Sequence, residues 1–158
     1  MKKIMNAGVF ELKGGALTTS FCCQQENGET DDATTQTLMD FIQQTDDLLP
    51  QVEALMKRHQ AGEYQPEPKY ENSCDWGVNQ TLLWLRPPTA KLGQLAITNE
   101  WTIYNGEDGD YGPPNQQHFT YEQFWAAMKH WQAFREIVAQ KGKENLVGQR
   151  FEAPWPEA

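Results

Sequence analysis

The stretch with the residue types best suited to chemistry is the acidic loop at 105–110 (NGEDGD). Closely spaced oxygen ligands of this kind can hold Ca²⁺, which takes six to eight of them. The acids do not follow the alternation of an EF-hand, and no glutamate closes the loop. Asp and Gly also make ordinary solvated turns. We therefore expect no metal site, and a calcium site in this loop is the alternative that the sequence leaves open.

Histidines are the next candidates, at His59, His118 and His130. Nucleophilic catalysis needs a Ser or Cys beside a His that a third group orients, and no local signature of such a site is present. His118 could meet a carboxylate of the acidic loop, but a His beside a helix start is more often structural. The glycines at 14 and 15 suit a hairpin turn and not a phosphate-binding loop. We expect no catalytic residue, no cofactor and no enzyme activity.

The three cysteines predict neither a disulfide framework nor a zinc site. Cys22 and Cys23 are adjacent, Cys74 stands alone, and no CxxC or Cys/His ligand spacing occurs. We expect buried or half-buried free thiols.

Negative charge is the strongest functional signal, because the net charge is −9 and the carboxylates are segregated. No Lys or Arg occurs between Lys13 and Lys57, or between Lys91 and Lys129. The acids of these two base-free segments are Glu26, Glu29, Asp31, Asp32, Asp40, Asp46, Asp47 and Glu53 in the first, and Glu100, Glu107, Asp108, Asp110 and Glu122 in the second. A surface of this kind repels nucleic acids and anionic lipids and attracts a basic protein.

Aromatic side chains outside the apolar pattern complete the candidate surface. Trp125 lies on the polar side of a predicted helix, and Tyr111 and Trp76 fall in predicted loops. Trp and Tyr within a polar rim are typical of interface anchors, although Trp125 could instead cover a neighbouring loop. The predicted partner-binding residues are Glu107, Asp108, Asp110, Tyr111, Glu122 and Trp125.

The element that must position this surface is a predicted helix at Tyr121–Lys141. Its apolar residues recur at helical spacing and form a stripe, which consists of Phe124, Ala127, Met128, Trp131, Phe134 and Val138. Thr120 and Gln123 form a potential capping box, and Gly142 is a stop signal.

Upstream, segments 8–12 and 17–23 predict a hairpin whose apolar residues would be Phe10, Leu12 and Phe21. Segment 33–59 carries a helical stripe that Pro50 interrupts, with Asp32 or Thr34 as its cap. Either one helix is kinked at Pro50, which projects to solvent, or Pro50 lies in the first turn of a second helix.

Two further strands are predicted, followed by a tail that docks on the body. Segment 79–86 is apolar on both faces, which indicates a central strand. Segment 92–105 alternates on one face, as one long strand or, if it turns at 99–100, as a hairpin. Phe151 and Trp155 anchor the tail. The order ββ-α(α)-ββ-α predicts an α+β fold, with a mainly antiparallel sheet of about four strands packed against two or three helices.

Residues 1–158 are long enough for a single globular domain. No run approaches the ~18 apolar residues of a membrane span. Glu11 and Lys13 interrupt the N-terminal segment before a signal-peptide core could form, so we expect a cytoplasmic protein.

These observations predict a small acidic binding protein, such as an immunity protein that neutralises a cationic toxin, for instance a nuclease, by occluding it. We expect a basic protein partner, no direct nucleic-acid binding and no membrane contact. One alternative is an enzyme or ligand-binding protein with a pocket between sheet and helix, walled by Trp84, Trp101 and Trp131, with His118 as acid–base. Another is an acidic DNA mimic that inhibits a DNA-binding protein.

Overall fold

The computed structural model describes residues 3–43, 45–65, 74–78, 81–94 and 116–157, without the side chains at 40, 43, 45–47 and 94. The helices are α1 (Asp32–Gln43), α2 (Thr45–Gln60) and α3 (Tyr121–Lys141), with a short 3-10 helix η2 (Lys143–Asn145). The strands are β1 (Ile4–Glu11), β2 (Leu17–Gln24), β3 (Trp76–Val78), β4 (Thr81–Arg86), β5 (Thr89–Gln94), β6 (Gln116–Thr120) and β7 (Arg150–Pro154). The predicted α+β class is confirmed, but the strands are divided between two antiparallel sheets.

The first sheet has the order β2-β1-β7. The predicted hairpin is confirmed, and Gly14 and Gly15 take positive φ in its turn. Its helix-facing side buries Met5, Ala7, Val9, Phe21 and Cys23. The prediction that Phe10 and Leu12 belong to the core is wrong, because their side chains are 53% and 52% exposed on the other side. Side chains alternate along a strand, so burying Val9 turns Phe10 outward.

The second sheet has the order β3-β4-β5-β6. β4 is central, as its two apolar faces predict, with Leu83 and Leu85 fully buried. Trp76 lies in β3 and not in a loop. Of the strand predicted at 92–105, only the start lies within described residues, in β5, so the choice between one strand and a hairpin lies outside them.

Segment 33–59 forms two helices, and since α1 ends at Gln43 and α2 begins at Thr45, Pro50 neither divides them nor lies in the first turn of the second. Pro50 lies inside α2 with an exposed side chain, as predicted. The cap of α1 is neither Asp32 nor Thr34. Asp31 accepts hydrogen bonds from the Thr34 backbone N–H (3.2 Å) and from its hydroxyl (2.8 Å).

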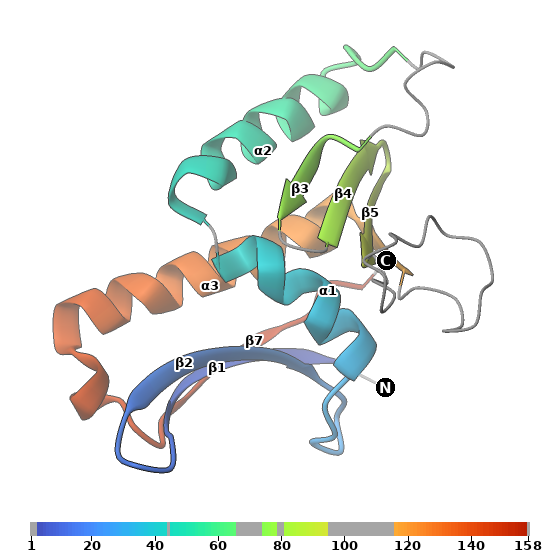
Figure 1. Ribbon diagram of the computed structural model, residues 1–158. Coiled ribbons are helices and arrows are strands. Elements are labelled where there is room, and N and C mark those ends of the chain that lie inside the picture. Colours follow the sequence, from blue (N-terminus) through green and yellow to red (C-terminus); the bar gives the residue numbers. More distant parts are fainter. Residues whose placement is uncertain (1–2, 44, 66–73, 79–80, 95–115, 158) are drawn as a thin grey trace, which may run out of the picture.

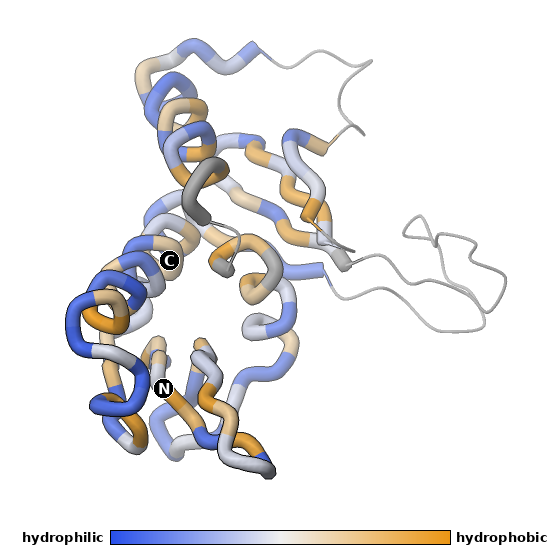
Figure 2. Tube along the Cα trace, turned by 60° about the vertical axis from the view of Figure 1, so that its left-hand side comes forward, coloured by the Kyte–Doolittle hydropathy of each residue, from blue (hydrophilic) through white to orange (hydrophobic). Residues whose placement is uncertain are grey.

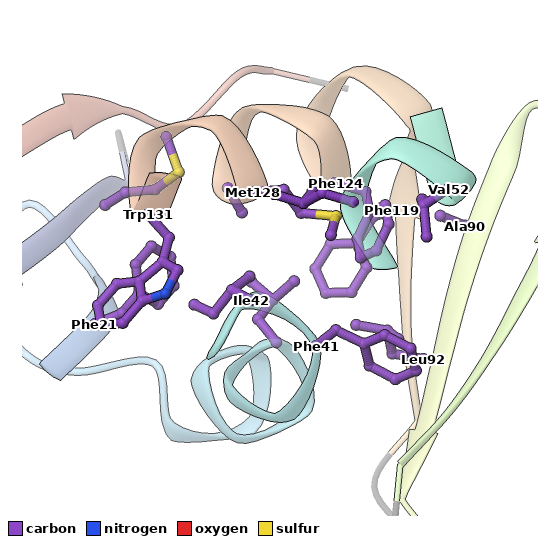
Figure 3. Packing of buried hydrophobic residues seen from close by; sticks show 14 of the residues in the cluster. Phe21, Phe41, Ile42, Val52, Ala90, Leu92, Phe119, Phe124, Met128 and Trp131 are labelled. Atoms are coloured by element: carbon purple, nitrogen blue, oxygen red, sulfur yellow. The ribbon is translucent and has the colours of Figure 1, made fainter. Parts of the chain in front are cut away.

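Helices α1 and α3 lie between the two sheets, and α2 lies beside β3 and β4 (Figure 1). Along the helices, hydrophobic and hydrophilic residues alternate in bands, as expected of elements with one buried side (Figure 2). Figure 3 shows the core that results. Phe21 of the first sheet faces Trp131 of α3, Ile42 and Phe41 of α1 lie in the centre, and Leu92 lies on the second sheet.

The prediction for α3 is confirmed at both ends. The helix spans Tyr121–Lys141, and Gly142 ends it with φ 83°. Five of the six predicted stripe residues are buried, and Val138 is half-buried. The tail docks as predicted, and it does so as a strand, because β7 pairs with β1 and the Trp155 ring packs edge-on against Phe119 at 5.8 Å.

Candidate functional site

The N-terminal end of α3 is the part of the predicted binding surface that the structure describes. β6 leads directly into it, and the predicted capping box is present there. The Gln123 N–H donates to Thr120 Oγ1 (3.1 Å), and the Thr120 N–H donates to Gln123 Oε1 (3.0 Å). Gln123 Nε2 also donates to the Pro156 carbonyl (2.9 Å). Strand, helix and tail are therefore held together at this point.

Two predicted site residues lie on this end of α3. Glu122 is exposed in the first turn, where a carboxylate interacts favourably with the helix dipole. Trp125 lies three residues further on, half-buried and packed against the core, with Lys129 Nζ 5.1 Å from its ring centroid. Trp125 therefore combines a structural role with a partly open ring. The other predicted residues, Glu107, Asp108, Asp110 and Tyr111, lie outside the described residues, as does the possible calcium loop.

A polar contact with α2, which the sequence did not suggest, fixes the same helix end. Tyr121 is buried, and its hydroxyl lies 2.8 Å from Nδ1 of His59 at the end of α2. The His59 ring also packs edge-on against Tyr64, with ring centroids 5.0 Å apart. Burial lowers the pKa of His59 below its ordinary value of 6.5, so the imidazole is neutral near pH 7.

The neighbouring ion pair joins Asp75 to Arg86. Asp75 Oδ2 accepts hydrogen bonds from Arg86 (2.8 Å) and from the Leu85 backbone N–H (2.7 Å). These bonds attach the segment before β3 to the end of β4. Burial, and next the negative charge of Asp75, raise the pKa of Tyr121. A raised pKa disfavours the tyrosinate, so Tyr121 is neutral, and its contact with His59 joins the end of α2 to the start of α3.

The two base-free segments meet at this end of the molecule. Helix α1 belongs to the first segment. It packs against β6, which belongs to the second segment, and against α3, which begins in it. Among the described carboxylates, exposed Asp32 lies in the first turn of α1, in the first segment, and exposed Glu122 lies in the first turn of α3, in the second.

The arrangement does not support the predicted pocket of the enzyme alternative. Trp131 packs in the core against Phe21, with ring centroids 6.4 Å apart. Trp84 lies on the side of β4 opposite to buried Leu83 and Leu85, with Lys91 Nζ 4.3 Å from its ring centroid. These two tryptophans therefore do not line one cavity, and Trp101 lies outside the described residues.

The remaining candidate residues are dispersed. His118 is exposed on β6 opposite Lys91, and His130 Nε2 donates to the Phe151 carbonyl at 2.8 Å. Cys23 is buried and Cys22 half-buried, as predicted, but Cys74 is exposed. Within the described ranges, no group of three or more His, Cys, Asp or Glu side chains could hold a metal ion.

Among the helices described, none is long and apolar enough to cross a membrane. Comparisons with known protein families, with curated proteins and with solved structures gave no match.

Proposed function

We propose that this protein binds and inhibits a basic protein partner, in the manner of an immunity protein that neutralises a cationic toxin such as a nuclease. The observation that carries the proposal is the meeting of the two base-free segments at α1, β6 and the start of α3. A concentrated negative potential accelerates encounter with a positive surface, by 10-fold to 10³-fold in favourable cases.

Two features support a binding surface at this junction. The start of α3 is fixed by the capping box, by the contact of His59 with Tyr121 and by the bond of Gln123 to the tail. A surface that is already rigid loses little conformational entropy when it binds. The partly open ring of Trp125 lies beside exposed Glu122, which is the combination of aromatic anchor and polar rim found at interfaces. Occlusion of the partner's active site would follow from binding of this negative surface.

The test is a binding assay with cationic nucleases, above all with a toxin encoded next to this chain. Association should be fast at low salt and should slow as salt rises, because screening weakens the attraction. The nuclease should lose activity in the complex. Absence of binding at low salt to such candidates would refute the proposal.

A matched pair of variants locates the surface. Glu122→Lys and Glu136→Lys make the same charge change on exposed positions of α3, but Glu136 lies four turns further along the helix. Glu122→Lys should reduce the association rate about tenfold, and Glu136→Lys should reduce it much less. Equal effects would show that net charge alone drives binding. Competition with DNA for the same partner would identify the protein as a DNA mimic.

A further inference from the structure

The side of the first sheet that faces away from the helices is a second candidate surface, which we call the outer face. The α-helices α1, α2 and α3 all lie on the other side of this sheet (Figure 1). Paired residues in an antiparallel sheet point to the same side, so the register defines the members of this face. They are Ile4, Asn6, Gly8 and Phe10 of β1, Thr18, Ser20, Cys22 and Gln24 of β2, and Arg150, Glu152 and Pro154 of β7.

An exposed aromatic ring, that of Phe10, lies at one end of the outer face. Two ring atoms of Phe10 lie 3.7 Å from the place where a Cβ on Gly8 would stand, so the ring leans over the bare backbone of Gly8. It nevertheless remains 53% exposed, and Leu12, two residues further on, is 52% exposed. Exposed aromatic side chains, Phe included, are enriched at protein interfaces relative to the rest of the surface.

The charges of the outer face balance, in contrast to the rest of the chain. Its only charged members are Arg150 and Glu152, which contact each other at 3.0 Å. Arg150 also reaches across β1 and donates to Gln24 Oε1 on β2 at 2.8 Å. The face is therefore neutral on a protein with a net charge of −9.

We propose that the outer face binds the outer face of a second copy of this chain, related to it by a two-fold axis. A two-fold interface is self-complementary, so each charge must meet its opposite on the other copy. One positive and one negative residue, two positions apart on the same strand, meet this requirement when Arg150 of each copy faces Glu152 of the other. Two acidic chains repel each other over most of their surfaces, and this neutral face is where they can approach closely.

Because the outer face is neutral, it offers no electrostatic attraction to the basic partner proposed for the N-terminal end of α3. The N-terminal end of α3 also lies far along the helix from the hairpin turn, which is near η2 and the C-terminal end of α3 (Figure 1). Pairing of outer faces would thus leave the proposed inhibitor surface of both copies open, and this inference does not depend on that function.

The size of the face sets the expected strength of the dimer. Eight residues of β1 span roughly 26 Å, and three strands span roughly 14 Å, from the usual rise and strand spacing. This area is smaller than the roughly 800 Å² per partner of a standard interface. The dimer should therefore form reversibly as chain concentration rises from micromolar towards millimolar.

Sedimentation velocity or light scattering on the full chain over that range tests the proposal. The wild-type mass should rise towards that of a dimer. Phe10→Ser and Arg150→Glu should each remain monomeric at concentrations where the wild type is mostly dimeric. The double variant Arg150→Glu/Glu152→Arg should dimerise again, because it restores complementary charges across the two-fold axis.

Lys57→Glu is the matched control, since it makes the same charge change at an exposed position of α2 and should leave dimerisation unchanged. Circular dichroism verifies that each variant is folded. A mass of one chain at all concentrations would overturn the proposal. So would a dimer that persists in both Phe10→Ser and Arg150→Glu, because a different surface would then hold it.

Discussion

Cys22 and Cys23 are neighbours in sequence but lie on opposite sides of the first sheet. Cys23 is fully buried beside Met5 on the side packed against the helices, and burial raises its pKa to about 12. Cys22 lies on the outer face, half-buried. Burial raises its pKa as well, but the positive charge of Arg150 opposes this. Adjacent residues of β2 therefore point to opposite sides of the sheet, one into the apolar core and the next onto the polar outer face.

This contrast shows how strongly strand register determines which side chains are buried. The helix-facing side holds residues that are packed in the core, and the outer face holds polar residues and the exposed ring of Phe10. A shift of pairing by one residue would exchange the two sets. Substitutions on the two sides should therefore differ sharply in their effect on stability.

The largest difference is expected between the two phenylalanines of the hairpin. Phe21 is 1% exposed and packs against Trp131, so Phe21→Ala should lower the free energy of unfolding by about 3–5 kcal/mol. Phe10→Ala removes the same atoms from the outer face and should cost about 0.5 kcal/mol. Urea unfolding of both variants measures the difference. Similar losses would show that Phe10 is a core residue after all, as the sequence had suggested.

A smaller effect is expected at the edge where the first sheet meets α1. Asp31 caps α1 and accepts a 2.6 Å hydrogen bond from Lys3. Asp31→Ala removes both the cap and the ion pair and should cost about 1–2 kcal/mol. Asp31→Asn retains a capping oxygen and should cost less. Its loss relative to the wild type measures the contact with Lys3, and the further loss in Asp31→Ala measures the cap.

The same contact should make stability depend on pH. Burial raises the pKa of Asp31, but hydrogen bonds from Lys3 and Thr34 outweigh it, and the net pKa lies below the ordinary 3.8. A carboxyl with a lowered pKa in the folded state stabilises the fold above its unfolded pKa, and this contribution is lost as the pH falls through the folded value. The stability difference between wild type and Asp31→Asn should therefore be constant above about pH 5 and shrink at lower pH. A difference that persists at pH 2 would contradict the ion-pair explanation.

How much of the fold the sequence predicts depends on the range of the interactions involved. Helix α3 and its capping box were predictable, because apolar spacing and caps act within a few residues. Strands β6 and β7 were not predictable from local pattern, since each is short and contributes only one or two apolar side chains to the core region. They are strands because β5 and β1 offer partners from distant parts of the chain.

The hairpin was predicted with its turn but with the wrong side inward for β1. The large side chains of Phe10 and Leu12 dominated the prediction, whereas Met5, Ala7 and Val9 form the buried side. Their positions opposite Phe21 and Cys23 follow from the pairing of the two strands, which local pattern does not reveal.

The candidate site also combines local features that the sequence predicts with long-range contacts that it does not. Glu122 and Trp125 could be placed together because they lie three residues apart on one helix. The contact of His59 with Tyr121 joins residues 62 positions apart, and no motif links them. The close approach of α1 to β6 and α3, which unites the two base-free segments, is likewise a product of tertiary packing.

The smallest effect concerns the thiols themselves. With a thiol reagent under native conditions, exposed Cys74 should react first, Cys22 more slowly, and Cys23 only when the protein opens, since the thiolate is the reactive form. Arg150→Gln removes the positive charge that lowers the pKa of Cys22, so its labelling near pH 8 should slow by about twofold. Lys57→Gln makes the same charge change away from the sheet and should leave the rate unchanged. Peptide mass mapping identifies which thiol has reacted. If Cys23 reacted as fast as Cys22 in the folded protein, the assignment of the two cysteines to opposite sides of the sheet, and with it the outer face, would have to be abandoned.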